Sequence, residues 1–218
     1  MTVELLRRAL TDPGDPPMRP VPARVSDLLE TLHAPPRLAA HLRAVHDVAW
    51  QLTDWVRRCR PAVAFDRPSV LFGAATHDVG KVVHVEELSG PGNDHERAGY
   101  ELLLTDGVEE RLARFARDHA SWTAAGIGFE DLLVSPADKV WKGKRVPDLE
   151  QLVVNHLAEP DARLHWQVFM ALDDELDRIA QDAPRRLAFQ SSHPVTGWWR
   201  AREGSAPATP APADERKA

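Results

Sequence analysis

Histidine and aspartate residues recur through the middle of the chain in an order that suits metal binding. The adjacent pair His77 and Asp78 lies in a strongly apolar stretch, where burying an imidazole and a carboxylate is costly unless something compensates. A second such pair, His46 and Asp47, shows that the dipeptide alone decides nothing. The ordered set is more informative, and its members are His46, His77, Asp78, His95, His119 and Asp138.

These side chains predict a site for two cations. Imidazole nitrogen and carboxylate oxygen suit iron, manganese, zinc, cobalt or nickel, and the lack of thiolate argues against a structural zinc site. Six side chains around one ion would leave no open position, whereas one bridging carboxylate can join two ions and leave both partly open. We therefore expect two divalent metal ions per chain, of unspecified identity.

The segments that position these residues are predicted to be helices. In residues 36–58 apolar side chains recur at spacings of three and four, which is the pattern of one buried helix face. No segment shows sustained two-residue alternation, so we expect an all-α bundle of about six to eight helices. The other expected helices cover 69–79, ended by Gly80, then 95–105, 108–121, 129–140 and 147–181, the last broken near Glu159 and Pro160.

The ends of the chain differ from its middle. Residues 11–23 hold five prolines, which exclude a continuous helix or a central strand there and leave an ordered wrap or a flexible arm. Residues 203–218 carry no large apolar side chain. We therefore expect a Pro-rich N-terminal arm over 1–23, a metal-binding catalytic domain over 24–182, an extension over 183–202 that packs on the bundle, and a disordered tail over 203–218. Within the extension, Trp198 and Trp199 would fold back on the bundle or face a partner.

The composition of the chain limits the kinds of partner that we expect it to bind. The chain has 27 Lys and Arg against 33 Asp and Glu, a net charge of −6, and this argues against binding duplex nucleic acid. A single cysteine, Cys59, excludes an internal disulfide. No stretch is apolar for the roughly 18 residues of a membrane span, and the first residues lack the apolar stretch of a signal peptide. These features predict a cytoplasmic protein without a membrane partner.

Four stretches carry a resemblance to a known superfamily. They read HLRAVHDVA (41–49), ATHDVGK (75–81), DHERAGYELL (94–103) and ARDHASW (116–122), and SPADKVWKGKR (135–145) follows them. In this order they resemble the dinuclear branch of the HD-domain metal-dependent phosphohydrolase superfamily, over about residues 36–145. The resemblance implies an HD-domain-like helical bundle around a metal centre.

The resemblance also implies a role for each matching residue. The first metal would be held by His46, His77, Asp78 and Asp138. Asp78 would bridge to a second metal held by His95 and His119. Lys81 matches the motif lysine of the family and would meet a phosphate oxygen. Further contacts to the substrate are expected from Lys139, Lys144 and Arg145, and Trp122 is a candidate pocket wall.

The implied activity is hydrolysis of a phosphate ester or phosphoanhydride in a nucleotide or another small phosphorylated metabolite. Metal-activated water would attack phosphorus, with Asp78 and Lys81 as the catalytic residues. Two alternatives stay open: a mixed-valence diiron oxygenase of the same superfamily, and a catalytically silent metal-binding regulatory module. Oxygenases of the superfamily typically place a lysine four residues after the ligand that His119 matches. This chain has Thr123 there, which favours hydrolysis.

Overall fold

The computed structural model describes residues 2–159 and 165–195, and these are all-helical, as predicted. Within that part of the chain there are ten α-helices and two 3-10 helices, more than the six to eight helices expected. The elements are α1 (Thr2–Thr11), α2 (Ala23–Thr31), α3 (Pro36–Cys59), α4 (Arg67–Thr76), η1 (Val79–Val82), η2 (Val85–Leu88), α5 (Asp94–Thr105), α6 (Glu110–Asp118), α7 (Phe129–Val140), α8 (Pro147–Ala158), α9 (His165–Ala180) and α10 (Ala183–Ser191).

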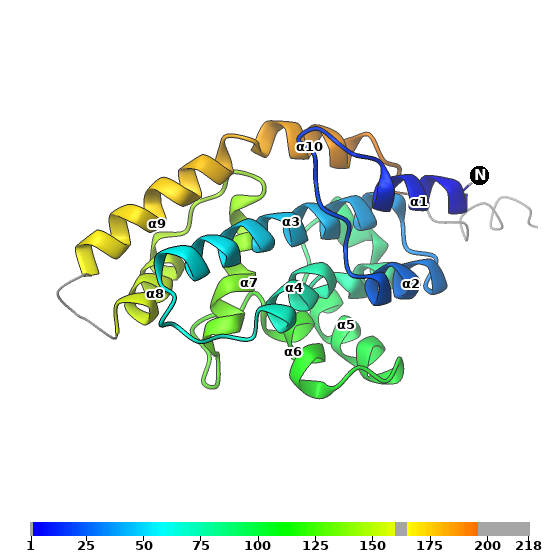
Figure 1. Ribbon diagram of the computed structural model, residues 1–218. Helices are drawn as coiled ribbons and strands as arrows, with labels where there is room; N and C mark the ends of the chain where they lie inside the picture. The colour runs from blue at the N-terminus through cyan, green and yellow to red at the C-terminus, as the bar shows by residue number, and fades with distance from the viewer. Residues whose placement is uncertain (1, 160–164, 196–218) are drawn as a thin grey trace, which may run out of the picture.

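Helix α3 runs through the middle of the molecule (Figure 1) and packs against α1, α4, α7, α9 and α10. Its first helical residue is Pro36, a position where the missing N–H costs nothing, and its predicted apolar face is buried along its whole length. Two apolar clusters form around α3, one with α7, α8 and α9, the other with α1, α2, α5 and α6. The helix therefore serves as the scaffold on which both halves of the core assemble.

The stretch after Pro68 departs from the prediction of one helix ended by Gly80. Asp66 caps α4 by accepting a hydrogen bond from the backbone N–H of Ser69 at 3.2 Å, and the α-helix then ends at Thr76. Beyond it the chain tightens into η1, which packs against α5. Residues His77 and Asp78 therefore lie at the junction of two elements rather than inside a helix.

The N-terminal region is a correction to the sequence prediction of an arm over 1–23. Residues Leu6, Ala9 and Leu10 of α1 are buried in the second apolar cluster. The proline-containing segment that follows crosses α3 (Figure 1), where the buried guanidinium of Arg43 donates hydrogen bonds to four of the surrounding backbone carbonyls. The structure thus adds a short amphipathic helix, α1, that was not expected, and of the two alternatives for residues 11–23 it has the ordered wrap.

At the other end, α10 packs against α3, and Arg37 donates to the backbone carbonyls of Ser191 and His193. Helix α8 ends at Ala158, next to the expected break near Glu159 and Pro160. The pair Trp198 and Trp199 and the expected tail over 203–218 lie outside the described residues. Within residues 2–159 and 165–195, no helix combines the length and apolar character that crossing a membrane requires.

Candidate metal centre

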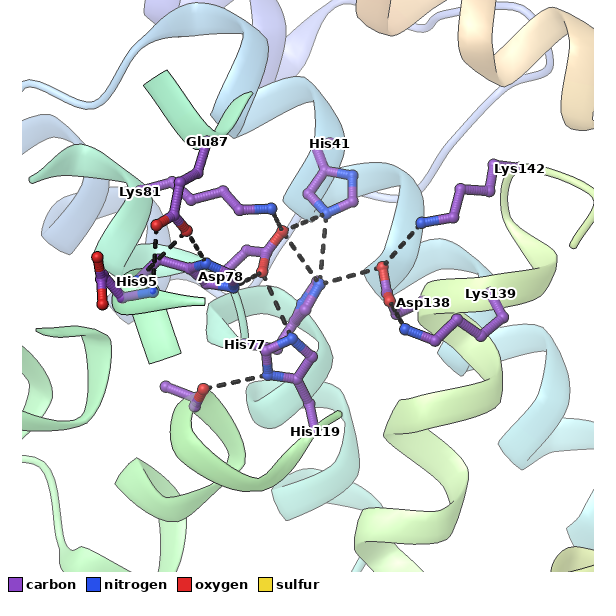
Figure 2. Close-up of polar contacts among 12 residues, drawn as sticks. His41, His77, Asp78, Lys81, Glu87, His95, His119, Asp138, Lys139 and Lys142 are labelled. Atoms are coloured by element: carbon purple, nitrogen blue, oxygen red, sulfur yellow. Dashed lines mark hydrogen bonds and ion pairs between the residues drawn. The ribbon is translucent and has the colours of Figure 1, made fainter. Parts of the chain in front are cut away.

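Five elements meet at one cluster of histidine and aspartate side chains (Figure 2). Asp78 lies at its middle, between the end of α4 and the start of η1. The side chains around it come from α3, from the end of α4, from the first turn of α5, from the end of α6 and from the last turn of α7: His41, His77, His95, His119 and Asp138. All six are buried, with exposed fractions of 6% or less.

Close backbone contact brings His95 to Asp78. A Cβ atom on Gly80 would overlap the backbone oxygen of His95 and would lie 2.5 Å from the backbone nitrogen of Gly99. Only glycine lets η1 approach α5 so closely. The sequence motif around Asp78 is therefore joined to the first turn of α5 by backbone packing as well as by side chains.

The two carboxylate oxygens of Asp78 face different groups of histidines. Oδ1 lies 2.9 Å from His95 Nε2 and 3.6 Å from His119 Nε2. Oδ2 lies 3.1 Å from His41 Nε2 and 3.7 Å from His77 Nε2, and His77 Nε2 is in turn 3.5 Å from Asp138 Oδ1. Asp78 thus stands between two sets of potential ligands, which is the arrangement that a bridging carboxylate requires.

Three of the histidines are held in the orientation that metal ligands need. His77 Nδ1 is 3.0 Å from the carbonyl oxygen of Ala74, and His119 Nδ1 is 3.1 Å from that of Ala116. His95 Nδ1 contacts the carboxylate of Glu87. Because a carbonyl or carboxylate can only accept, each Nδ1 carries the hydrogen, and each Nε2 presents a lone pair toward Asp78.

Electrostatics favour the ligand forms of His119 and of the two aspartates at neutral pH, whereas for His95 burial acts to lower the pKa but the carboxylates of Asp78 and Glu87 outweigh it and raise that pKa. Burial lowers the pKa of His119 to about 4, so its imidazole is neutral. Burial acts to raise the pKa of Asp78, but the surrounding histidines, His77 first and then His41 and His95, outweigh it when they carry a proton and hold that pKa well below its usual range. The same holds for Asp138 through His77 and nearby lysines. Neutral imidazole and ionised carboxylate are the states that bind cations.

The residues present fit a pair of divalent cations. His95 Nε2 is buried without a hydrogen-bond donor, and it lies 2.9 Å from a carboxylate oxygen that likewise can only accept. Two ligand atoms bound at right angles to one cation are about 3 Å apart when each bond is near 2.1 Å. With the hydrogen of His95 on Nδ1, this contact would set one acceptor against another, and a shared cation would relieve it.

A pocket of about 360 Å³ opens onto this cluster. Its wall includes Lys81, Lys139 and Lys142, and Trp141 and Gln190 from the end of α7 and from α10. Lys81 Nζ is 2.6 Å from Asp78 Oδ2, and Lys139 Nζ is 2.6 Å from Asp138 Oδ2. Three ammonium groups around one buried cluster make the pocket suitable for an anion.

His46 is a correction to the predicted ligand set. His46 is buried, but it lies outside the cluster. His41 occupies the position among the potential ligands that the sequence analysis assigned to His46. Five residues along a helix correspond to a rotation of about 140°, so the two histidines face different sides of α3. The surroundings of His46 are Asp47, Arg19 and Arg43 instead.

We expect His46→Leu to leave metal binding unchanged and to make folding less sensitive to acid. Burial lowers the pKa of His46 to about 4, against about 6.5 in an unfolded chain. Between these values the unfolded chain binds a proton that the folded chain does not, so the free energy of unfolding falls as the pH drops below about 6.5. By pH 5 this costs about 2 kcal/mol, at about 1.4 kcal/mol per pH unit.

Urea unfolding at pH 7 and at pH 5 measures this difference, and metal analysis of the same samples measures the cation content. The matched variant is His41→Leu, which should lose cations. An equal acid sensitivity in His46→Leu and wild type, or a loss of metal from His46→Leu, would contradict the exchange of roles.

Three of the predicted substrate contacts are also corrected. Arg145 is ion-paired with Glu150, Asp173 and Asp177, so its guanidinium is already satisfied away from the pocket. Lys144 is exposed and does not line the pocket, because Gly143, at φ 76°, turns the chain away after Lys142. Trp122 packs against the apolar core, with its ring centre 5.7 Å from Lys139 Nζ, rather than forming the wall.

Sequence reasoning missed other residues that the fold brings to the site. Lys142 follows Asp138 by four residues, a spacing that places both on one helix face and that could have indicated it. Its Nζ lies 3.8 Å from Asp138 Oδ1, and burial lowers the pKa of this lysine. Glu87 reaches His95 from a short 3-10 helix, and no periodic pattern could have indicated that contact.

Comparison with known proteins yields one kind of relative. No protein-family model matches the chain, and no solved structure matches it. Among curated proteins it is similar to a tRNA (cytidine(56)-2'-O)-methyltransferase of Picrophilus torridus, with 25% identity in an alignment of 180 residues. The alignment includes 71% of this chain and 48% of the relative, so the chain spans about half the length of the curated protein it matches.

This comparison contradicts the predicted hydrolase. The relative is named as a methyltransferase, which transfers a methyl group, and its name describes neither a phosphohydrolase nor an oxygenase. The prediction of phosphate ester or phosphoanhydride hydrolysis is therefore wrong by this comparison, and the cluster requires an interpretation that does not depend on hydrolysis.

Proposed function

We propose that this chain is an HD-type metal-binding domain whose pocket holds two divalent cations and binds the phosphate group of a small nucleotide. The observation that carries the proposal is the position of Asp78, whose two oxygens face two separate sets of histidine Nε2 atoms at the base of a lysine-lined pocket. In this proposal the pocket binds the nucleotide and does not convert it to products.

The chain's own residues divide into two sets. One cation would be held by His41, His77 and Asp138, and the other by His95, Glu96 and His119. Asp78 would contribute one oxygen to each. When bound, the cations supply a local positive field that an acidic protein of net charge −6 otherwise lacks.

The lysines orient an anion over this field. Lys81 comes from η1 on one side of the cluster, and Lys139 and Lys142 come from the end of α7 on another (Figure 2). An ammonium group donates up to three hydrogen bonds, and a phosphate accepts them with little geometric restriction. A phosphate placed over the cluster would therefore meet donors from both sides.

The test is a titration of the metal-free protein with Mn²⁺, followed by a titration of the loaded protein with AMP. We expect two Mn²⁺ per chain, and AMP binding that requires them. Lys81→Met should weaken AMP binding about tenfold, the size of one hydrogen bond between charged groups. Lys144→Met is the control and should change nothing, because Lys144 does not line the pocket.

Three results would contradict the proposal: no bound Mn²⁺, AMP binding that persists in EDTA, or conversion of AMP to products during the titration. The last result would show turnover and not a binding role.

A second candidate is a part in tRNA methylation, which the similarity to the methyltransferase of Picrophilus torridus favours. Transfer of a labelled methyl group from S-adenosylmethionine to a cytidine 2'-oxygen of tRNA measures it directly. Methylated tRNA with the chain alone would place methyl transfer in this domain. If methylation required a second protein in addition to this chain, the chain would assist the reaction without carrying it out. That result would be consistent with its match to about half of the relative.

A further inference from the structure

Glu87 anchors one side of the metal centre from outside the set of ligands. Its carboxylate is buried, at 5% exposure of the side chain, and it contacts His95 Nδ1 through Oε2. The same carboxylate accepts hydrogen bonds from the backbone N–H groups of Asp94 at 3.1 Å and of His95 at 3.4 Å. Glu87 therefore holds both the imidazole of His95 and the first turn of α5.

The contact with Glu87 takes the place of a capping side chain at the start of α5. Asn93 precedes α5 but makes no side-chain capping hydrogen bond, so the carboxylate of Glu87 serves the free N–H groups at this helix start. Gly92 makes the arrangement possible, because a Cβ atom there would overlap the Glu87 side chain. The loop from η2 to α5 is thus shaped around this one carboxylate.

The anchor of His95 differs from those of the other two oriented histidines. His77 and His119 donate from Nδ1 to carbonyls three residues earlier in their own chain segments, Ala74 and Ala116. The anchor of His95 is a charged side chain from a separate element. A carboxylate on the far nitrogen of a ligand histidine fixes its tautomer and strengthens it as a ligand.

We propose that Glu87 is a positioning residue that fixes His95 with its hydrogen on Nδ1, and that it thereby controls one of the two cation sites and not the other. The second half of this inference rests on the proposed function. The site affected is the one with His95 and His119, while the site with His41, His77 and Asp138 has no contact with Glu87 among the described residues.

The first test uses Mn²⁺ titration of Glu87→Ala. We expect one of the two binding steps to weaken 10- to 100-fold, the effect typical of residues that support ligands, and the other to change less than about threefold. Glu87→Gln should lose less, because it keeps the size and one acceptor oxygen. The matched control is Glu86→Ala, which removes an exposed glutamate from the same short helix.

The second test needs no metal. Long-range proton–nitrogen NMR spectra of the histidine rings distinguish the two neutral tautomers, and His95→Gln assigns the signal. In wild type at about pH 8.5, where an ordinary imidazole is neutral, we expect the hydrogen on Nδ1 of His95. In Glu87→Ala the signal should shift to a mixture, with the His77 and His119 signals unchanged.

The outcomes separate the two proposals. Equal weakening of both Mn²⁺ steps, an equal effect of Glu86→Ala, or an unchanged His95 tautomer in Glu87→Ala would overturn the role of Glu87. Absence of Mn²⁺ binding in wild type would overturn the proposed function, and the tautomer measurement would still decide whether Glu87 positions His95.

Discussion

If the cluster holds two cations as proposed, replacing Asp78 with alanine should remove both of them, whereas replacing Asp138 should remove one. Asp78 is the only side chain of the cluster whose two oxygens face both sets of histidines among the described residues. Asp138 contacts His77 alone of those histidines. Because even residues that only support ligands cost 10- to 100-fold in affinity, loss of a shared ligand should weaken both Mn²⁺ steps by more than about 100-fold.

Metal analysis and Mn²⁺ titration of the two variants measure this difference side by side. Circular dichroism is the control for folding, and Asp78→Asn, which keeps the volume of the side chain, guards against a defect caused by the cavity alone. If Asp78→Ala retained one cation at wild-type affinity, the shared carboxylate would be refuted. If Asp138→Ala lost both, the division of the ligands into two sets would be wrong.

Replacing Gly80 with alanine should destabilise the fold by at least about 3 kcal/mol, at the upper end of the cost of overpacking. The added methyl group would overlap the backbone oxygen of His95 and would lie 2.5 Å from the backbone nitrogen of Gly99. Backbone atoms of α5 cannot give way as the end of a flexible side chain can. The helix must therefore move away from η1 and carry His95 away from Asp78.

Urea unfolding measures this loss, and Mn²⁺ titration of the folded fraction should show weakened binding at one site. Gly107→Ala and Gly126→Ala are the matched controls. Both glycines have positive φ values, 76° and 87°, but neither has an atom within 4 Å of an added Cβ. They should cost only the strain of the left-handed backbone, about 1 kcal/mol. A cost for Gly80→Ala no larger than these would refute the close contact.

Much of the helical framework follows from the sequence, because helix periodicity is a local property. The helix over 36–59 was predicted to within one residue, and α7 has the predicted bounds of 129–140. The sequence analysis did not predict helix α1. A short amphipathic helix is only marginally stable by itself, and α1 depends on the burial of Leu6 and Leu10 in the core.

The choice between two histidines of α3 illustrates what periodicity leaves open. His41 and His46 are both buried, so neither burial nor residue type distinguishes them. Which one reaches Asp78 depends on where α4 and α7 pack around α3. Similarly, Lys139 and Arg145 are alike in charge, but two of the three carboxylates around Arg145, those of Asp173 and Asp177, come from α9, distant in sequence.

The sequence by itself determined the helical class of the fold and the chemical nature of the cluster, since nitrogen and oxygen ligands in a set order already exclude a thiolate site. Only the tertiary structure decided which histidine of α3 joins Asp78, which lysines line the pocket, and that Glu87 supports His95. The physical reason is that residue type and helical period are local, whereas a metal centre is made by side chains of separate elements that meet only when the core is packed.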